Sequence, residues 1–273
     1  MFNEIVRAEI WLQDTLESQE TIDTLAERLG YSTSQVRRRF RQHFGMSPSA
    51  YREALRLEKA SRLLIHTPLG IRTVAGRCGY TNHSAFSRAF LRRFRHSPRH
   101  HRLTGREALV EAAARAGSAP RPEVETLPPC AAVVAREYAT SETLPPPRRW
   151  LERLDGYPLP LPGASERAAA LLLLHDPGPP SGLPRLDLGV LVDGESAGSL
   201  PIPPTLRLLE LPRTRCACLD LPGPQRIHDT LVALLAALPE MGEHYNGDPV
   251  RLVRSESALT LQLPLLDGEE TPR

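Results

Sequence analysis

The sequence has few cysteines and lacks a long apolar run, and both absences narrow the class of protein. Its four cysteines in 273 residues include no C-x-x-C pair, so neither a disulfide scaffold nor a zinc motif is indicated. No run approaches the roughly 18 apolar residues of a membrane span, and the first residues have neither the basic lead nor the apolar stretch of a signal peptide. We therefore expect a cytoplasmic protein with no metal, no cofactor and no membrane partner.

Charge and proline are distributed unevenly along the chain. Residues 1–116 hold 20 of the 34 Lys and Arg residues and 11 of the 32 Asp and Glu residues, a balance of +9, and the remainder has a balance of −7. Only three of the 27 prolines precede residue 117. The sequence therefore predicts two domains of different chemistry, residues 1–116 and 123–266, joined by a linker over residues 117–122.

A repeat in the basic half predicts two helix-turn-helix units. Residues 22–31 and 71–80 share apolar residues at helical spacing and end in a Gly-Tyr pair, and glycine readily adopts the left-handed conformation at a helix end. Beyond the tyrosines, phenylalanines and a Ser-Pro pair recur at an offset of 50 residues, which marks the inner face of a second helix in each unit. We expect Ser32 to cap the second helix of the first unit and Thr81 to hold the equivalent place in the other.

The second helix of each unit carries residue types suited to reading DNA. In a helix-turn-helix this helix enters the major groove, where Arg recognises guanine and Ser or His bonds to base edges or phosphates. The outward residues are Ser34, Arg37, Arg38 and Arg41 in the first unit and His83, Ser84, Ser87, Arg88, Arg92 and Arg93 in the second. A charged face is also typical of a merely solvated helix, but here it occurs twice in register with the same turn.

The segment between the units predicts one longer helix. Residues 49–66 have a helical apolar stripe that ends before Pro68. Such a helix spans roughly 25 Å at 1.5 Å per residue, which is compatible with holding two reading helices about one DNA turn, roughly 34 Å, apart. We therefore expect one chain to read two adjacent major-groove segments of double-stranded DNA without dimerising.

These residues carry a family resemblance. The double unit, with Gly30-Tyr31, Phe44 to Pro48, Cys78-Gly79-Tyr80 and Ser97-Pro98, resembles the all-α DNA-binding domain of AraC/XylS-type transcription regulators over about residues 1–104. The resemblance implies base-facing positions for Ser34, Arg37, Arg38, His83, Ser84, Ser87 and Arg88. We assign phosphate contacts to Arg41, Arg92 and Arg93, and we expect RNA polymerase as a protein partner.

The acidic half shows a second repeat. Strand-like segments at 127–135 and 211–219 are each followed by a helical segment, at 146–154 and 227–238. Two further strand-like segments follow each helix, at 167–175 and 186–193 in the first copy and at 250–254 and 258–265 in the second. This β-α-β-β order, found twice, predicts a pseudo-twofold α+β domain with helices on one side of the sheets and a cleft between the halves.

This half is similar to the GyrI-like effector-binding domain over roughly residues 121–266, most clearly in the segment 243–249 and the strand 261–265. Relatives that bind organic cations often place a glutamate where Thr260 stands here, and an aromatic wall attracts such cations. Residues of these types are also typical of an ordinary core or rim. The candidate pocket residues are Tyr138, Trp150, Tyr157, Tyr245 and Thr260.

Three functions stay open for the acidic half. The first is binding of a small-molecule effector that shifts the DNA-binding state of a one-component transcription regulator. The second is a protein-interaction module, and the third is a small hydrolase-like enzyme. Spacing locates neither paired carboxylates nor a nucleophile with a nearby base, so we do not expect an enzyme.

Overall fold

The computed structural model describes residues 2–117, 121–138, 170–175, 185–192, 202, 206–223, 226–255 and 258–267. The chain forms two compact units, which divide between Arg106 and Glu107. The linker expected over residues 117–122 lies beyond this division and stays a prediction. Among the helices of the described residues, none combines the length and the apolar character that a membrane span requires.

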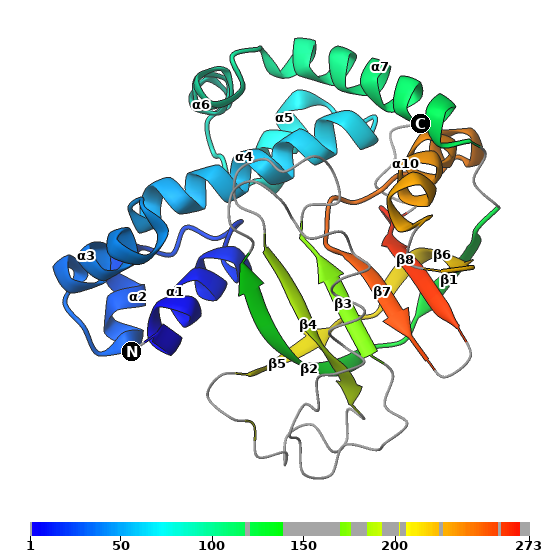
Figure 1. Cartoon of the computed structure of the whole chain (residues 1–273). Coiled ribbons are helices and arrows are strands. Elements are labelled where there is room, and N and C mark those ends of the chain that lie inside the picture. The colour runs from blue at the N-terminus through cyan, green and yellow to red at the C-terminus, as the bar shows by residue number, and fades with distance from the viewer. Residues whose placement is uncertain are drawn as a thin grey trace. The chain divides into compact units, whose positions relative to one another are not determined.

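The first unit is helical (Figure 1). After α1 (Phe2–Asp14) come two pairs of short helices, α2 (Ile22–Leu29) with α3 (Thr33–Phe44) and α5 (Ile71–Arg77) with α6 (His83–Phe94). The longer α4 (Pro48–His66) joins the two pairs, and α7 (Pro98–Ala116) begins in this unit. The predicted double helix-turn-helix is confirmed.

Each pair of short helices turns at a glycine with positive φ. The φ angle is 69° at Gly30 and 75° at Gly79, a conformation that glycine adopts without steric cost. The space around the two glycines differs. A β-carbon on Gly30 would meet no atom within 4 Å, whereas one on Gly79 would lie 2.4 Å from the carbonyl oxygen of Leu16. The second turn therefore packs directly against the segment that follows α1.

Side-chain caps determine where α3 and α6 begin. The Ser32 hydroxyl accepts a hydrogen bond from the amide of Gln35, whose side chain accepts one in return, so the predicted capping box is present. The prediction that Thr81 holds the equivalent place is wrong. Asn82 is the N-cap, and its Oδ1 accepts a hydrogen bond from the amide of Ala85 at 3.0 Å. The reason is that the two repeats are already 50 residues apart at the cap, so Ser32 corresponds to Asn82 and not to Thr81.

The inner faces of the short helices form the core of the first unit. Phe40 of α3 and Phe86 and Phe90 of α6 are fully buried. Tyr51 of α4 packs edge-on against Phe40, with ring centroids 5.3 Å apart. Burying a side chain of this size stabilises a fold by about 1.5–3 kcal/mol, so these aromatic residues contribute substantially to the core. The predicted apolar stripe of α4 is buried as expected.

Arginines hold the connecting segments through backbone carbonyl groups. Arg52 and Arg56 of α4 donate hydrogen bonds to carbonyls within residues 16–20. Arg102 and Arg106 of α7 donate to carbonyls in the last turn of α4. Cations are favourable at a helix C-terminus, where the carbonyl dipoles point outward. Burial lowers the pKa of Arg52, Arg56 and Arg102, so these guanidinium groups are structural and partly removed from solvent.

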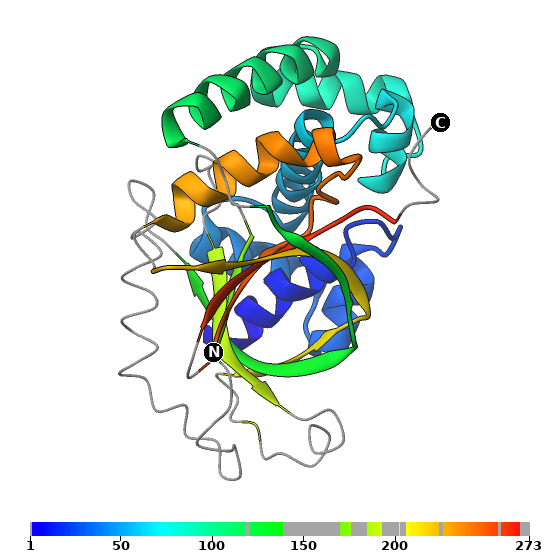
Figure 2. The same ribbon diagram turned by 90° about the vertical axis from the view of Figure 1, so that its right-hand side faces the viewer.

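The described part of the second unit contains one curled antiparallel sheet (Figure 2). Its eight strands lie in the order β1-β6-β8-β7-β3-β4-β2-β5. When each of β1, β2, β3 and β4 is exchanged with its counterpart β5, β6, β7 or β8, the same order results, read from the other end. The strand order is therefore symmetric about the β3–β7 pair. The strands are β1 (Glu123–Leu127), β2 (Cys130–Tyr138), β3 (Ala170–Leu174), β4 (Arg185–Val192), β5 (Arg207–Leu211), β6 (Thr214–Leu221), β7 (Val250–Arg254) and β8 (Leu259–Pro264).

The structure corrects the expected strand count. Each half begins with two strands rather than one, because an additional strand, β1 or β5, precedes each predicted strand and ends at its first residue. Proline, which lacks the N–H that a β-ladder needs, separates the two strands of each pair. Pro128 and Pro129 separate β1 from β2, and Pro212 separates β5 from β6. Since β1 pairs with β6 and β5 with β2, the first strand of each half extends the other half. The β3–β7 pair joins the two halves, so the sheet is continuous, with β1 and β5 at its edges.

One face of this sheet is covered by α10 (Ile227–Ala237), which is followed by the short helix η2 (Leu238–Met241). Leu231 and Leu234 of α10 share a core with Leu186 and Leu252 of the sheet. A smaller apolar cluster, which includes Val134 and Leu171, lies on the opposite face. The helix expected over residues 146–154 lies outside the described residues.

Candidate nucleic-acid interface

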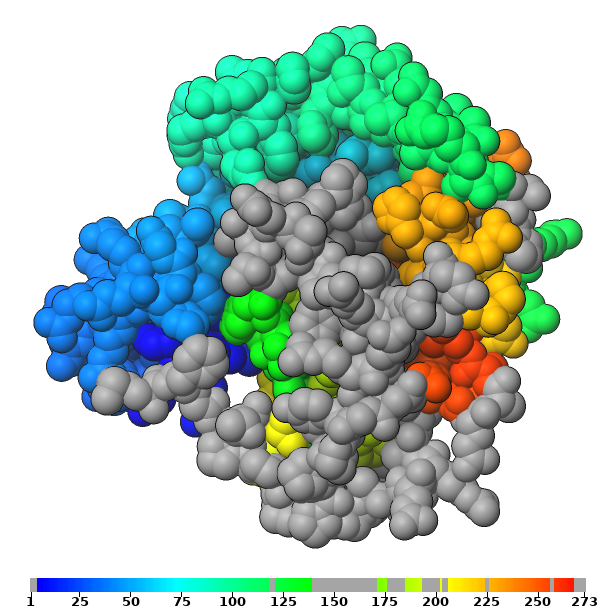
Figure 3. All heavy atoms as spheres, in the orientation of Figure 1, coloured from blue at the N-terminus to red at the C-terminus, as the bar shows by residue number. Residues whose placement is uncertain are grey.

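The predicted reading helices α3 and α6 lie at the surface of the first unit (Figure 3). Each buries one face, through Val36 and Phe40 in α3 and through Phe86 and Phe90 in α6. The opposite faces are open to solvent, because Ser34, Arg37, Arg38, His83, Ser84 and Arg88 are exposed and Ser87 is half-buried. The structure thus leaves the predicted base-reading residues accessible.

The two outward faces are similar at some positions and different at others. Arg38 and Arg88 are equivalent at the 50-residue offset, as are Ser34 and Ser84. One turn further along, Arg41 in α3 is replaced by Leu91 in α6, and Leu91 is 51% exposed. Other equivalent pairs also differ, among them Arg37 with Ser87, Gln42 with Arg92, and Gly45 with Arg95. The faces therefore offer different groups to a partner.

The three predicted phosphate-contact arginines are all exposed but have different surroundings. Arg41 lies in the last turn of α3. Nη2 of Arg92 donates hydrogen bonds to both carboxylate oxygens of Glu53 in α4, at 2.9 and 3.0 Å. The guanidinium of Arg93 lies 5.3 Å from the ring centroid of Phe94. Sequence reasoning missed the Arg92–Glu53 pair because its partners are 39 residues apart.

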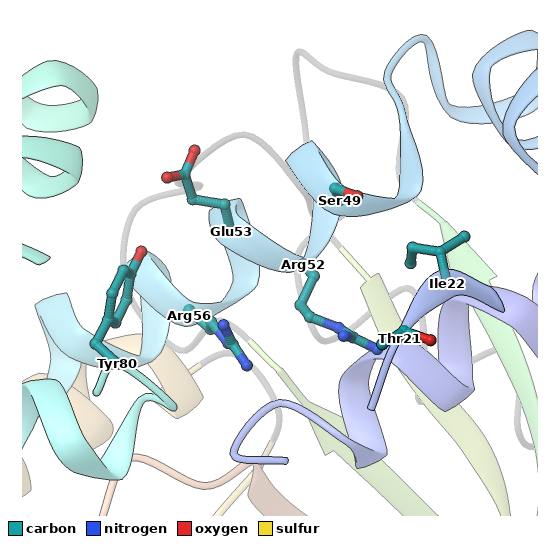
Figure 4. A pocket seen from close by; sticks show the side chains of 7 residues that line it. All are labelled: Thr21, Ile22, Ser49, Arg52, Glu53, Arg56 and Tyr80. Atoms are coloured by element: carbon teal, nitrogen blue, oxygen red, sulfur yellow. The ribbon is translucent and has the colours of Figure 1, made fainter. Parts of the chain in front are cut away.

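Two hollows lie beside α4. The first has a volume of about 290 Å³ and is lined by Thr21, Ile22, Ser49, Arg52, Glu53, Arg56 and Tyr80 (Figure 4). The second has a volume of about 250 Å³ and is lined by Ala50, Glu53, Ala54, Leu57, Ala89, Arg92, Arg93 and Arg95. Glu53 contributes to both, and Figure 4 shows it pointing away from Arg52 and Arg56. It therefore lies on the surface of α4 between the two hollows.

Arg95 ends α6 in a conformation that favours glycine. Its φ is 64°, close to the 74° of Gly45 at the end of α3. Both amides donate to the carbonyl four residues earlier, at 2.8 Å from Arg95 and 2.9 Å from Gly45. The left-handed conformation costs a residue with a β-carbon roughly 1–2 kcal/mol. Arg95 therefore lines the second hollow in a conformation that is unfavourable by this amount.

The predicted effector-pocket residues are divided between the faces of the sheet. Tyr245 is 1% exposed and belongs to the core that α10 shares with the sheet, which favours a packing role. Tyr138 and Thr260 lie on the other face, because side chains alternate along a strand. Tyr138 is four residues from Val134 and therefore shares its face, which carries the smaller cluster. Thr260 precedes Leu261, which belongs to the core beneath α10, and therefore points to the opposite face. Trp150 and Tyr157 lie outside the described residues.

Thr260 has an acidic neighbour that sequence reasoning missed. Its hydroxyl donates a hydrogen bond to Oδ1 of Asp220 at 2.6 Å. The two residues are direct partners across the β6–β8 pair. A carboxylate is therefore present beside Thr260. The register between β6 and β8, which the sequence does not reveal, brings it there.

A buried cluster of charged residues lies on the same face as Tyr138. Asp187 is 0% exposed and accepts hydrogen bonds from Arg136 at 2.6 Å, His175 at 2.8 Å and Arg207 at 2.8 Å. Burial would raise the pKa of Asp187, but Arg136 and His175 hold it well below its usual range. Burial, together with Arg136, lowers the pKa of His175 to about 3, so this imidazole is neutral at pH 7. The cluster joins β2, β4 and β5.

Comparison with known proteins identifies a family for part of the first unit. Residues 25–104 match the family described as a helix-turn-helix domain. The HTH-type transcriptional activator RhaS of Salmonella paratyphi B is 36% identical over 101 residues, which are 37% of this chain and 36% of RhaS. The chain thus spans about a third of the length of the curated relatives it matches.

Two solved structures are similar to part of the chain. A transcriptional regulator from Chromobacterium violaceum with an AraC-type DNA-binding domain is 29% identical, with a TM-score of 0.36 over 37% of this chain and 91% of that chain. The DNA-binding domain of AdpA, solved with a target DNA, is 31% identical, with a TM-score of 0.37 over 38% of this chain and 94% of that chain. Residues 25–104 form a helix-turn-helix domain, which is similar to AraC-type DNA-binding domains of known structure.

Proposed function

We propose that this protein is a sequence-specific transcription regulator whose single chain reads two adjacent major-groove segments of double-stranded DNA. The observation that carries the proposal is the presentation of Arg38 and Arg88 at equivalent, exposed places on two capped helices. Arginine donates two hydrogen bonds to guanine, which distinguishes this base in the major groove. The other base-reading residues in this proposal are Ser34, Arg37, His83, Ser84 and Ser87.

Arg41, Arg92 and Arg93 supply the phosphate contacts in this proposal. They are exposed in the last turns of α3 and α6. Contacts to phosphates fix the position of a protein on the duplex and carry no sequence information directly. The balance of +9 over residues 1–116 adds a general attraction to DNA.

For residues 123–266 we propose a GyrI-like domain that binds a small-molecule effector. The strand order, which is symmetric between β1–β4 and β5–β8, supports a repeated unit. Binding of an effector would bias the state in which the regulator binds DNA or recruits RNA polymerase. A protein-interaction module and a small hydrolase-like enzyme are the alternatives for this domain.

Selection of bound DNA from a random pool tests the DNA-binding proposal. The full chain at physiological salt is expected to enrich a motif of two elements about one helical turn apart. A pool without enrichment, with and without added cell extract, would contradict the proposal.

Native mass spectrometry of the full chain mixed with a metabolite extract tests the second domain. A small-molecule adduct is the expected result. Capture of a protein instead would favour the interaction module, and chemical conversion of the bound molecule would favour the enzyme.

A further inference from the structure

We propose that Glu53 is a specificity-determining residue. It restrains Arg92 and thereby lowers the affinity of α6 for DNA phosphates, which does not depend on the base sequence. The inference rests on the proposed function, because it concerns how tightly the helix-turn-helix domain binds DNA. It adds a residue of α4 that lies outside both reading helices.

The geometry of the pair supports restraint. One nitrogen of Arg92 donates to both carboxylate oxygens of Glu53, at 2.9 and 3.0 Å. The side chains are 64% and 42% exposed, so solvent and an approaching phosphate reach both. The guanidinium is therefore accessible to DNA but already neutralised by a carboxylate.

A phosphate that approaches Arg92 also comes close to the negative charge of Glu53. If the ion pair persists, the phosphate meets a carboxylate at short range. If the pair opens, its stabilisation is lost, which for an exposed pair amounts to at most about fivefold in an equilibrium constant. Either way, Arg92 neutralises a phosphate less effectively than an unpaired arginine. Affinity that depends on phosphates alone is reduced, while the hydrogen bonds that Arg88 would make to bases are unaffected.

The surroundings of Glu53 make this restraint specific to α6. Within the described lining of the second hollow, Glu53 is the one carboxylate beside Arg92, Arg93 and Arg95. In α3 the position equivalent to Arg92 is held by the uncharged Gln42. The reading helix that carries more arginines in its last turn, two against one, is thus the one with an acidic partner on α4.

A double-mutant cycle on the full chain tests the proposal with a random-sequence DNA duplex as the probe. Dissociation constants are measured by fluorescence anisotropy over a range of KCl concentrations for wild type, Glu53→Gln, Arg92→Gln and the double variant. Glu53→Gln is expected to tighten binding about threefold to fivefold and to steepen the dependence of log K on log [KCl] by about 0.9, as one added phosphate contact does. Arg92→Gln should abolish this gain in the Glu53→Gln background, and it should weaken binding less in the wild type, where the pair with Glu53 already limits the phosphate contact of Arg92.

Glu27→Gln is the matched control, since it removes an exposed carboxylate from α2 of the same unit. It should leave the salt dependence unchanged. An equal gain from Glu27→Gln, no gain from Glu53→Gln, or equal losses from Arg92→Gln in both backgrounds would overturn the restraint while leaving the proposed function intact. Absence of DNA binding by every variant would overturn both.

Discussion

The two helix-turn-helix units share a backbone and differ in what they present to a partner. Gly30 and Gly79 turn the chain with nearly the same φ, and buried phenylalanines recur at the 50-residue offset. The exposed positions have diverged, as Arg41 against Leu91 shows. The turn glycines and a buried phenylalanine are therefore repeated, whereas exposed positions are particular to each unit.

The largest expected difference between the units concerns their turn glycines. Gly79→Ala places a β-carbon 2.4 Å from the Leu16 carbonyl oxygen and strains a positive φ, so it should destabilise the first unit by about 3 kcal/mol or more. Gly30→Ala has the same strain but free space, and should cost about 1 kcal/mol. Hydrogen exchange of the most protected amides of the first unit measures both values. Equal costs would contradict the close packing at the second turn.

The reading helices should each control one element of the DNA site. Arg88→Ala is expected to weaken binding to a selected site by about 1–3 kcal/mol and to relax base preference in one element, and Arg38→Ala should do the same in the other. Arg41→Ala should instead weaken binding to all sequences and flatten the salt dependence by about 0.9. Repeating the DNA selection with each variant distinguishes these outcomes. If Arg88→Ala weakened selected and random DNA equally, its base-reading role would be wrong.

The residues that end α3 and α6 can be exchanged, because Gly45 and Arg95 adopt the same left-handed conformation at equivalent positions. Arg95→Gly should stabilise the first unit by about 1 kcal/mol, because glycine adopts φ near 64° without strain. Gly45→Arg should destabilise it by a similar amount. Both free energies of unfolding follow from hydrogen exchange. A loss of stability in Arg95→Gly would show that contacts of the side chain outweigh the strain.

The smallest expected effects concern the caps. Ser32→Ala and Asn82→Ala should each cost about 1 kcal/mol, since each removes the acceptor for an amide in the first turn of a reading helix. Thr81→Ala, one residue before the true cap, should change stability by less than about 0.5 kcal/mol. Amide exchange in the first turns of α3 and α6 reports these losses. A larger effect at Thr81 than at Asn82 would contradict the observed cap.

Much of the first unit could be predicted from the sequence because its determinants are local. Apolar residues at helical spacing, two Gly-Tyr turns and the Ser32 capping box all lie within a few residues of the structure they produce. The contacts between segments could not be predicted in this way. Arg56 binds the carbonyl groups of Leu16 and Ser18, 40 and 38 residues away, and any exposed carbonyl could accept such bonds.

The second unit shows the same limit more strongly. Six of the eight described strands coincide with predicted segments, but β1 and β5 were not predicted, and their pairing with β6 and β2 is a long-range exchange. Register then decides which polar residues meet, as with Thr260 and Asp220. Asp187 stands out in the sequence as a carboxylate within an apolar strand, yet its three partners come from other segments of the sheet.

The central claim is that one chain reads two segments at a spacing set by α4, and changing the DNA spacing tests it most directly. Five base pairs are inserted between the two elements of a selected site, which rotates them to opposite sides of the duplex because a turn is about 10–10.5 base pairs. The account predicts that the affinity of the full chain falls to that of a site with a single element. Unchanged affinity for the inserted site would contradict it, because two independently bound readers would then explain the data.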